Sequence, residues 1–172
     1  MPHMTDPYFQ KSLIYVCEHD SDGALGLIIN KPIPSKSAEE ILTQTGLDSV
    51  RPHLEVYFGG PVKVEMGLFL HDSAYETEDS MVVNKEITLS TNENIIHDIM
   101  DKKGPKNYLF TLGYAGWGSG QMEREIENGD WLVMPATFDF IFSTPDNSKW
   151  EKAAQQFGID IKTFSGGTSG LA

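Results

Sequence analysis

Short runs of β-branched and aromatic residues recur along almost the whole chain, and they constrain the fold more than any other feature. Such runs are typical of strands, and here the helical patterns between them follow no regular strand–helix–strand alternation. This order predicts an α+β fold with a strongly twisted, mostly antiparallel sheet that is partly barrel-like. The expected strands are residues 13–17, 24–30, 55–58, 66–70, 81–83, 87–89, 108–112, 131–134, 138–142 and 159–164.

Turn and cap signals divide these runs into elements. Asp22-Gly23 separates the first two runs, and this dipeptide between apolar segments predicts a hairpin because glycine takes positive φ without steric cost. Capping-box spacing (Ser-x-x-Glu), proline at the first helical position and terminal glycines bound the helical patterns. The expected helices are Ser37 to Gly46, Ser90 to Gly104, an acidic helix around Met122 and Ile126, and Thr144 to Gly158.

The chain contains no internal repeat and no linker that would mark a second domain. Its 172 residues, 40% of them hydrophobic, suit one packed core. We therefore expect a single domain over residues 1–164. Residues 165–172 are rich in glycine and serine and are expected to form a flexible tail.

The charge balance argues against direct binding to nucleic acids. The net charge is −12, from 13 Lys and Arg against 25 Asp and Glu, whereas affinity for DNA depends on neutralising phosphates. The densest basic stretch, Lys102, Lys103 and Lys106, is short. The single cysteine, Cys17, excludes an intramolecular disulfide, and neither a secretory signal nor a membrane-spanning run is visible. We expect a cytoplasmic protein without a membrane partner.

A glycine–aromatic junction from Gly113 to Gly120 is the most distinctive motif. It follows an expected strand and opens an expected helix, where phosphate-binding loops are found. However, Gln121 stands where a dinucleotide fingerprint needs glycine, and Ser119 stands where a P-loop needs lysine. We favour a structural strand-to-helix turn. The alternative is an anion or nucleotide site in which the backbone amides of residues 116–121 form a nest.

Other candidate chemistry is sparse. Cys17 and His19 are two residues apart on an expected strand and could form a nucleophile pair, although a buried cysteine and a surface histidine are the preferred interpretation. The acidic turn around Asp20 lacks the glycine and glutamate spacing of a calcium loop. The five histidines show no metal-ligand spacing, and no nucleophile elbow is present. The sequence thus predicts no metal, no cofactor and no catalytic residue.

Distinctive motifs are spread in order over nearly the whole chain. They are Met1-Pro2-His3-Met4 with Asp6-Pro7 and Phe9, Cys17-Glu18-His19, Asp22-Gly23-Ala24, Gly26-Leu27, Asn30-Lys31-Pro32, Tyr57-Phe58-Gly59-Gly60-Pro61-Val62, Leu112 to Gly118, Gly120-Gln121, Glu125-Ile126, Trp131 and Thr144-Pro145 with Trp150. In this combination the sequence resembles the YqgE/AlgH family of bacterial proteins.

The resemblance implies an α+β fold with a bifurcated, partly barrel-like sheet surrounded by helices. It implies no agreed catalytic residues, and some members carry the label of transcriptional regulator on genetic grounds. The family usually has an apolar segment before the Met-Pro-x-Met motif. Because the sequence begins at that motif, we expect the first sheet edge to be open.

These observations favour an uncharacterised regulatory or binding protein that acts on a protein or small-molecule partner without catalysis. One alternative is a nucleotide- or phosphate-binding enzyme or sensor centred on the glycine junction. Another is a transcriptional regulator that acts indirectly rather than by DNA contact. The candidate ligand-binding residues are Cys17, His19, Tyr57, Gly59, Gly60, Gly116, Trp117, Gly118, Ser119 and Gly120. Convergence of these residues in space would argue for a site.

Overall fold

The computed structural model describes residues 6–35, 37, 40, 43 and 54–159. Within these residues seven strands form one sheet in the order β1–β2–β7–β4–β6–β5, with β3 paired to β7 outside this path. The strands are β1 (Ile14–Asp20), β2 (Gly23–Ile28), β3 (Val56–Phe58), β4 (Val62–Asp72), β5 (Ser80–Val82), β6 (Ile87–Ser90) and β7 (Tyr108–Gly118). Only the pairing of β3 with β7 is parallel among these strands, so the predicted α+β fold with a mostly antiparallel sheet is confirmed.

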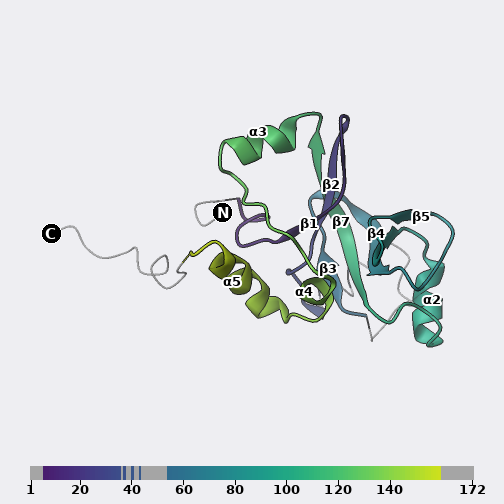
Figure 1. The fold of residues 1–172 in the computed structure, drawn as a ribbon. Helices are drawn as coiled ribbons and strands as arrows, with labels where there is room; N and C mark the ends of the chain where they lie inside the picture. Colours follow the sequence, from purple (N-terminus) through teal and green to yellow (C-terminus); the bar gives the residue numbers. More distant parts are fainter. Residues whose placement is uncertain (1–5, 36, 38–39, 41–42, 44–53, 160–172) are drawn as a thin grey trace.

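The sheet divides at β7. The first half of β7, Tyr108 to Leu112, pairs with β4 along one edge, and part of it pairs with β3 along the other. The second half, Ala115 to Gly118, pairs with β2. Between the halves Gly113 takes a φ of +70°, and the sheet curls there into a half-barrel (Figure 1). This arrangement agrees with the bifurcated, partly barrel-like sheet that the resemblance implies.

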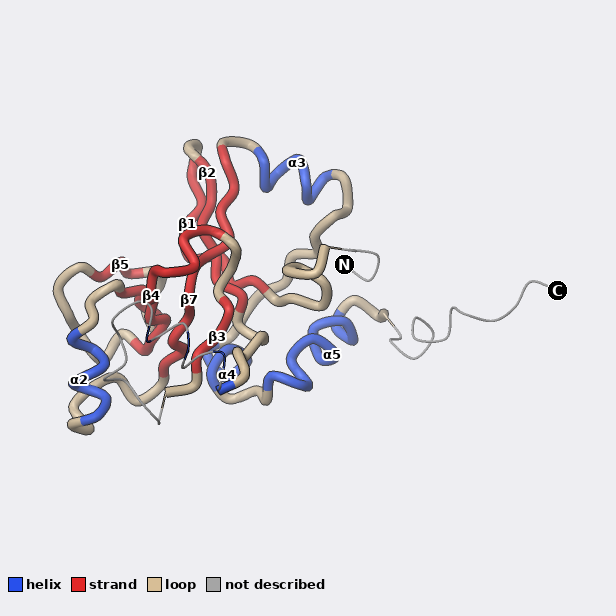
Figure 2. Tube along the Cα trace, turned by 180° about the vertical axis from the view of Figure 1, so that it is seen from behind, coloured by secondary structure: helices blue, strands red, loops and turns tan. Residues whose placement is uncertain are grey.

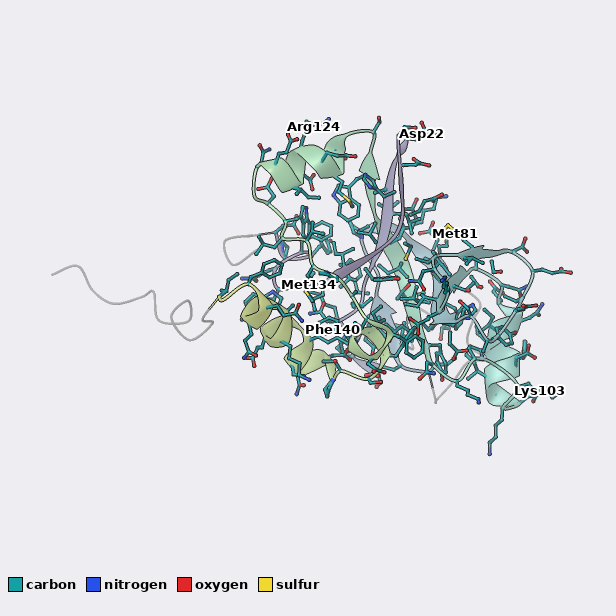
Figure 3. The ribbon with its side chains drawn as sticks, in the orientation of Figure 1. Asp22, Met81, Lys103, Arg124, Met134 and Phe140 are labelled. Atoms are coloured by element: carbon teal, nitrogen blue, oxygen red, sulfur yellow. The ribbon has the colours of Figure 1, made fainter. Side chains whose placement is uncertain are left out.

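The predicted hairpin is formed by β1 and β2, and Asp22 lies at its tip (Figure 3). Asp20 Oδ1 accepts the N–H groups of Asp22 and Gly23 at 2.8 and 3.2 Å, which fixes the turn. The pairing register shifts between Val16 and Glu18, so Cys17 is the extra residue of a β-bulge. Among the described strands β1 lies at one edge of the sheet.

Four helices with defined bounds flank the sheet: α2 (Asn94–Met100), α3 (Gln121–Glu127), α4 (Phe138–Phe142) and α5 (Asp146–Gln156). Helix α2 lies at the end of the molecule formed by β4, β5 and β6, whereas α3 and α5 lie at the opposite end (Figures 1 and 2). Ile95 and Ile96 of α2 pack against Phe69 and Phe110 of the sheet. No helix in the described part of the chain has the length and apolarity needed to cross a bilayer.

Three strand predictions around the glycine junction and after it are wrong. The strand expected to end at residue 112 continues to Gly118, because its second half finds a partner in β2. Residues 131–134 have no strand structure, and residues 138–142 form α4. Helix α4 forms because Thr137 Oγ1 accepts the N–H of Phe140 as an N-cap, and Ile141 becomes fully buried one turn further on.

The capping box at Ser90 is also wrong. Ser90 is the last residue of β6, and its Oγ lies 2.8 Å from Nε2 of the buried His71, so it is not free to cap a helix. Helix α2 begins at Asn94, whose N–H donates to Asn92 Oδ1. Pro145 precedes α5 instead of occupying its first position.

Three predictions lie wholly or partly outside the described residues. Of the helix expected over 37–46, the described positions Ser37, Glu40 and Thr43 are helical, and the other positions are not described. Of the strand expected over 159–164, only Ile159 is described, and it is not in a strand. The tail at 165–172 is not described.

Candidate functional site

The glycine junction is held by contacts within the chain. Gly116 and Gly118 pair with Leu25 and Gly23 of β2, and the Gly118 N–H also donates to Gln121 Oε1 at 3.0 Å. Ser119 Oγ donates to the carbonyl of Ser21 at 2.6 Å and so ties the junction to the β1–β2 turn. Gly120 then enters α3 with a φ of +64°. Gly116, Gly118 and Ser119 thus each make a contact that holds the junction in place.

Glu125, on α3, orients two tryptophans beside the junction. Its Oε2 accepts Trp117 Nε1 at 2.9 Å and Trp131 Nε1 at 2.7 Å, while Gln121 Nε2 donates to Oε1 at 2.8 Å. Burial acts to raise the pKa of Glu125, but the hydrogen bonds from Gln121, Trp131 and Trp117 outweigh it and the pKa lies below its ordinary value. The carboxylate is thus ionised at neutral pH and accepts a hydrogen bond from each indole N–H, which fixes the orientation of both rings.

The two indoles and Phe9 form an aromatic wall. The ring centroids of Trp117 and Trp131 lie 6.1 Å apart in an edge-to-face arrangement, and those of Phe9 and Trp131 lie 5.7 Å apart in the same manner. Trp117 is only 9% exposed, so its ring belongs to a packed cluster with Ala115 and Met122. Both tryptophans line two separate cavities, which makes this wall the centre of the candidate site.

We call the first of these the apolar cavity. Its volume is about 290 Å³, and it is lined by residues of β1, α3, the segment 131–136, α4 and α5. Met134 and Phe140 belong to its lining and are labelled in Figure 3. Five of its lining residues have large hydrophobic side chains that are exposed, and such side chains are rarely clustered on the surface of a protein. They are Val16, Ile126, Leu132, Val133 and Phe157.

We call the second the acidic cavity. Its volume is about 280 Å³, and it lies where the N-terminal segment, β7 and α3 meet. Three acidic residues, Asp6, Glu125 and Asp130, line it together with Phe9 and the two tryptophans. Ala115 and Gly116 also contribute to its lining, so two residues of the glycine junction face this space in addition to Trp117.

The remaining sequence-predicted site residues do not join this wall. Cys17 belongs to the core cluster, whereas His19 is exposed and donates from Nε2 to Glu123 Oε1 at 2.7 Å. Gly59 and Gly60 lie against the backbone of β7 at residues 113–115. The structure therefore brings Gly116 and Trp117 to the cavities and distributes the other candidates through the fold.

Tyr57 belongs to a separate polar cluster that fixes α5. Its hydroxyl lies 3.0 Å from Glu55 Oε2 and 2.9 Å from Asp146 Oδ2, and burial followed by these carboxylates raises the pKa of the phenol. Lys149 is 2% exposed, and its Nζ donates to Asp146 Oδ1 and to the carbonyl of Ile29, both at 2.9 Å. The cluster attaches α5, which forms one side of the apolar cavity, to the sheet.

The bulge at Cys17 leads to a prediction about its reactivity. Burial, and to a smaller extent Glu18, raises the pKa of the Cys17 thiol from 9.0 to about 12. Since the thiolate is the reactive form, native Cys17 should react with a disulfide reagent at pH 8 on the order of a thousandfold more slowly than the unfolded chain. Absorbance of the released thiolate, measured with and without denaturant, checks this. Rapid modification of the native protein would show that the thiol is activated after all.

Sequence reasoning missed most of the cavity residues. Leu132 and Val133 were expected in a strand, and the structure leaves them 45% and 67% exposed on an irregular segment. Asp6 belongs to a distinctive motif, but nothing in the sequence groups it with Asp130, because the two lie 124 positions apart in the chain and meet only through folding. Glu125 stood out in the sequence only as part of a distinctive motif, and its place in a short helix next to the junction could have marked it as a site residue.

Comparison with known proteins gives consistent results over the whole chain. A protein-family model described as AlgH-like matches residues 1–162. A UPF0301 protein of Methylococcus capsulatus is 42% identical over 168 residues, covering 96% of this chain and 89% of the relative. A UPF0301 protein of Pseudoalteromonas translucida is 36% identical over 169 residues, covering 96% of this chain and 91% of the relative.

Solved structures agree with these matches. The solution structure of the AlgH protein from Pseudomonas aeruginosa has a TM-score of 0.77 and 34% identity, covering 100% of this chain and 92% of that chain. A crystal structure of a protein from Corynebacterium diphtheriae has a TM-score of 0.72 at 19% identity, covering 95% of this chain and 86% of that chain, and shows the shared fold.

Proposed function

Since the chain belongs to the AlgH-like family, we propose that it is a cytoplasmic regulatory or binding protein that holds an apolar group of its partner in the apolar cavity and catalyses no reaction. The observation that carries this proposal is the cavity of about 290 Å³ with exposed hydrophobic side chains around it. Mostly apolar cavities with a few polar groups are the usual binding sites of proteins. The family agrees with the resemblance seen in the sequence.

The polar groups of the apolar cavity support binding over catalysis. Ser12 Oγ donates to the carbonyl of Tyr8 at 2.9 Å, and the Tyr15 hydroxyl accepts Asn84 Nδ2 at 2.9 Å. Burial raises the pKa of Tyr15 above its ordinary value. The phenol therefore stays protonated at neutral pH and cannot accept a proton as a general base. The lining therefore offers shape and apolar contact, with little acid–base chemistry.

A regulatory effect on transcription would be indirect in this proposal. The net charge of −12 repels the phosphate backbone, and the exposed apolar side chains suit contact with a protein or a small molecule. The protein would therefore change gene expression by holding a partner, without touching DNA itself.

Filling the cavity tests the proposal. Ala154 is 7% exposed and lines the apolar cavity from α5, so Ala154→Phe should occupy part of the space. We expect the wild type to enhance the fluorescence of N-phenylnaphthylamine, a neutral apolar dye, and the variant to bind it at least about tenfold more weakly because a ring replaces the ligand's contacts.

Ala74→Phe is the matched control, because Ala74 is exposed in the loop after β4 and does not line the cavity. It should leave dye affinity unchanged, and thermal unfolding should show that both variants are folded. A wild type that does not enhance the dye, or an Ala154→Phe variant that binds it normally, would contradict the proposal.

A further inference from the structure

The two cavities offer different chemistry on either side of one wall. Three acidic residues, Asp6, Glu125 and Asp130, line the acidic cavity together with the aromatic residues Phe9, Trp117 and Trp131. Aromatic faces combined with carboxylates attract organic cations, because the ring quadrupole and the negative charge act in the same direction. Within the described part of the chain no group of His, Cys, Asp and Glu side chains has the arrangement of a metal site. The chemistry of this cavity therefore suits an ammonium or guanidinium group.

The carboxylates of the acidic cavity differ in how far they are already engaged. Glu125 accepts three hydrogen bonds and is close enough to Arg124 to be affected by its charge. Asp6 Oδ1 accepts the N–H groups of Tyr8 and Phe9 at 2.8 and 3.3 Å. Asp130 is exposed and forms no ion pair with a described cation. Asp130 is thus the carboxylate most available to a cation that enters.

Several of the apolar side chains that line the apolar cavity are exposed and form an apolar patch. A small ligand that lies wholly inside the cavity would leave this patch uncovered. Val133 is 67% exposed and Leu132 45% exposed, and both line the cavity, as do the exposed Ile126 and Phe157. Exposed clusters of this kind mark surfaces that contact other macromolecules. Glu123 and Glu127, on the same helix as Ile126, are exposed and add negative charge.

These three observations define one kind of partner. On the basis of the proposed apolar site, we propose that the partner is a basic amphipathic peptide segment of another protein. Its apolar side chains enter the apolar cavity, and one of its Lys or Arg side chains enters the acidic cavity across the wall of Trp117 and Trp131. An amphipathic segment in an apolar groove is a recurrent mode of recognition, and the net charge of −12 favours the encounter with a basic chain.

The probe for the test is a fluorescently labelled peptide of about 18 residues, made of leucine and lysine. The two residues are spaced so that a helix would have leucine on one face and lysine on the other. A second peptide has glutamate at every lysine position. Fluorescence anisotropy at low salt should show binding of the lysine peptide to the wild type, weakening as salt rises, and at least about tenfold weaker binding of the glutamate peptide. Equal binding of the two peptides would overturn the inference.

Variants separate this site from general charge attraction. Asp130→Asn and Ala154→Phe should each weaken binding of the lysine peptide about fivefold to tenfold, because one removes a charge partner and the other fills the apolar space. Asp101→Asn makes the same charge change at the opposite end of the molecule, after α2, and should leave affinity within about twofold. If Asp101→Asn and Asp130→Asn weaken binding equally, the peptide binds by net charge alone and the inference is wrong.

The outcome also distinguishes this inference from the proposed function. If the dye binds and is excluded by Ala154→Phe while the lysine peptide does not bind, the apolar site stands and the peptide partner is overturned. If neither dye nor peptide binds, the apolar site itself is wrong.

Discussion

Replacing Gly113 with alanine should remove most of the stability of the fold, lowering the free energy of unfolding by at least about 4 kcal/mol. A Cβ at this position would lie 2.4 Å from the carbonyl oxygen of Gly60 and 2.9 Å from that of Val62. Both contacts are with backbone, so no side chain can rotate away to relieve them. Since domains are stable by only about 5–15 kcal/mol, a loss of this size takes a large part of that stability, and the variant should unfold at a clearly lower urea concentration than the wild type.

Gly129→Ala is the matched control for backbone strain. Gly129 has a φ of +79°, close to the +70° of Gly113, but a Cβ there would meet no atom within 4 Å. The shared left-handed conformation should cost each variant about 1–2 kcal/mol, and only Gly113→Ala adds the collision. Urea unfolding measured by tryptophan fluorescence gives the comparison. Equal losses for the two variants would mean that β7 shifts to accommodate the methyl group.

The same close approach explains why glycines recur in two separate motifs of the sequence. A Cβ on Gly59 would lie 2.2 Å from the carbonyl oxygen of Gly113, and one on Gly60 would lie 2.2 Å from the carbonyl carbon of Tyr114. The turn after β3 therefore crosses β7 with backbone against backbone. The sequence shows that both motifs are rich in glycine. It does not show that the two motifs pack against each other, which is the reason that each requires glycine.

The sequence predicted the structure correctly where residues close together in the chain determine it. The β1–β2 hairpin follows from Asp22-Gly23 and the flanking apolar runs, and the structure has it there. The bulge at Cys17 could not be predicted, since it is a shift in the pairing register of β1 with β2, which the alternation of residue types does not give. Residues 138–142 show apolar spacing that fits a strand or a helix, and the cap from Thr137 decided for the helix.

The candidate site was predicted only in part for a related reason. Trp117 and Gly116 were singled out because their motif is distinctive, and both line the acidic cavity. Asp6 and Asp130 contribute to the same cavity from segments far apart in the chain, so their proximity is a property of the tertiary fold. In the sequence Leu132 and Val133 resembled ordinary core residues, because a run of apolar residues does not show which of them are exposed in the folded chain.

Replacing Lys149 with methionine should lower the free energy of unfolding by about 3 kcal/mol, within the range for breaking a buried ion pair. Lys149 is 2% exposed, and its Nζ donates to Asp146 Oδ1 and to the Ile29 carbonyl. Methionine fills similar space but donates no hydrogen bond, so the partly buried carboxylate of Asp146 keeps the Tyr57 hydroxyl but loses its cation, and the Ile29 carbonyl loses this donor. The matched control is Lys152→Met, one turn along α5 and exposed, which should change stability by no more than about 0.5 kcal/mol.

The loss should also reach the apolar cavity, because the Lys149 contacts attach α5 to the sheet and Trp150, Ala153 and Ala154 line the cavity from that helix. We expect Lys149→Met to bind N-phenylnaphthylamine several-fold more weakly even at temperatures where it is fully folded, since a less firmly held α5 encloses the dye less well. Adding Asp146→Asn should restore part of the stability, because it removes the carboxylate left without a cation. Full stability and normal dye affinity in Lys149→Met would show that side-chain packing alone holds α5 in place.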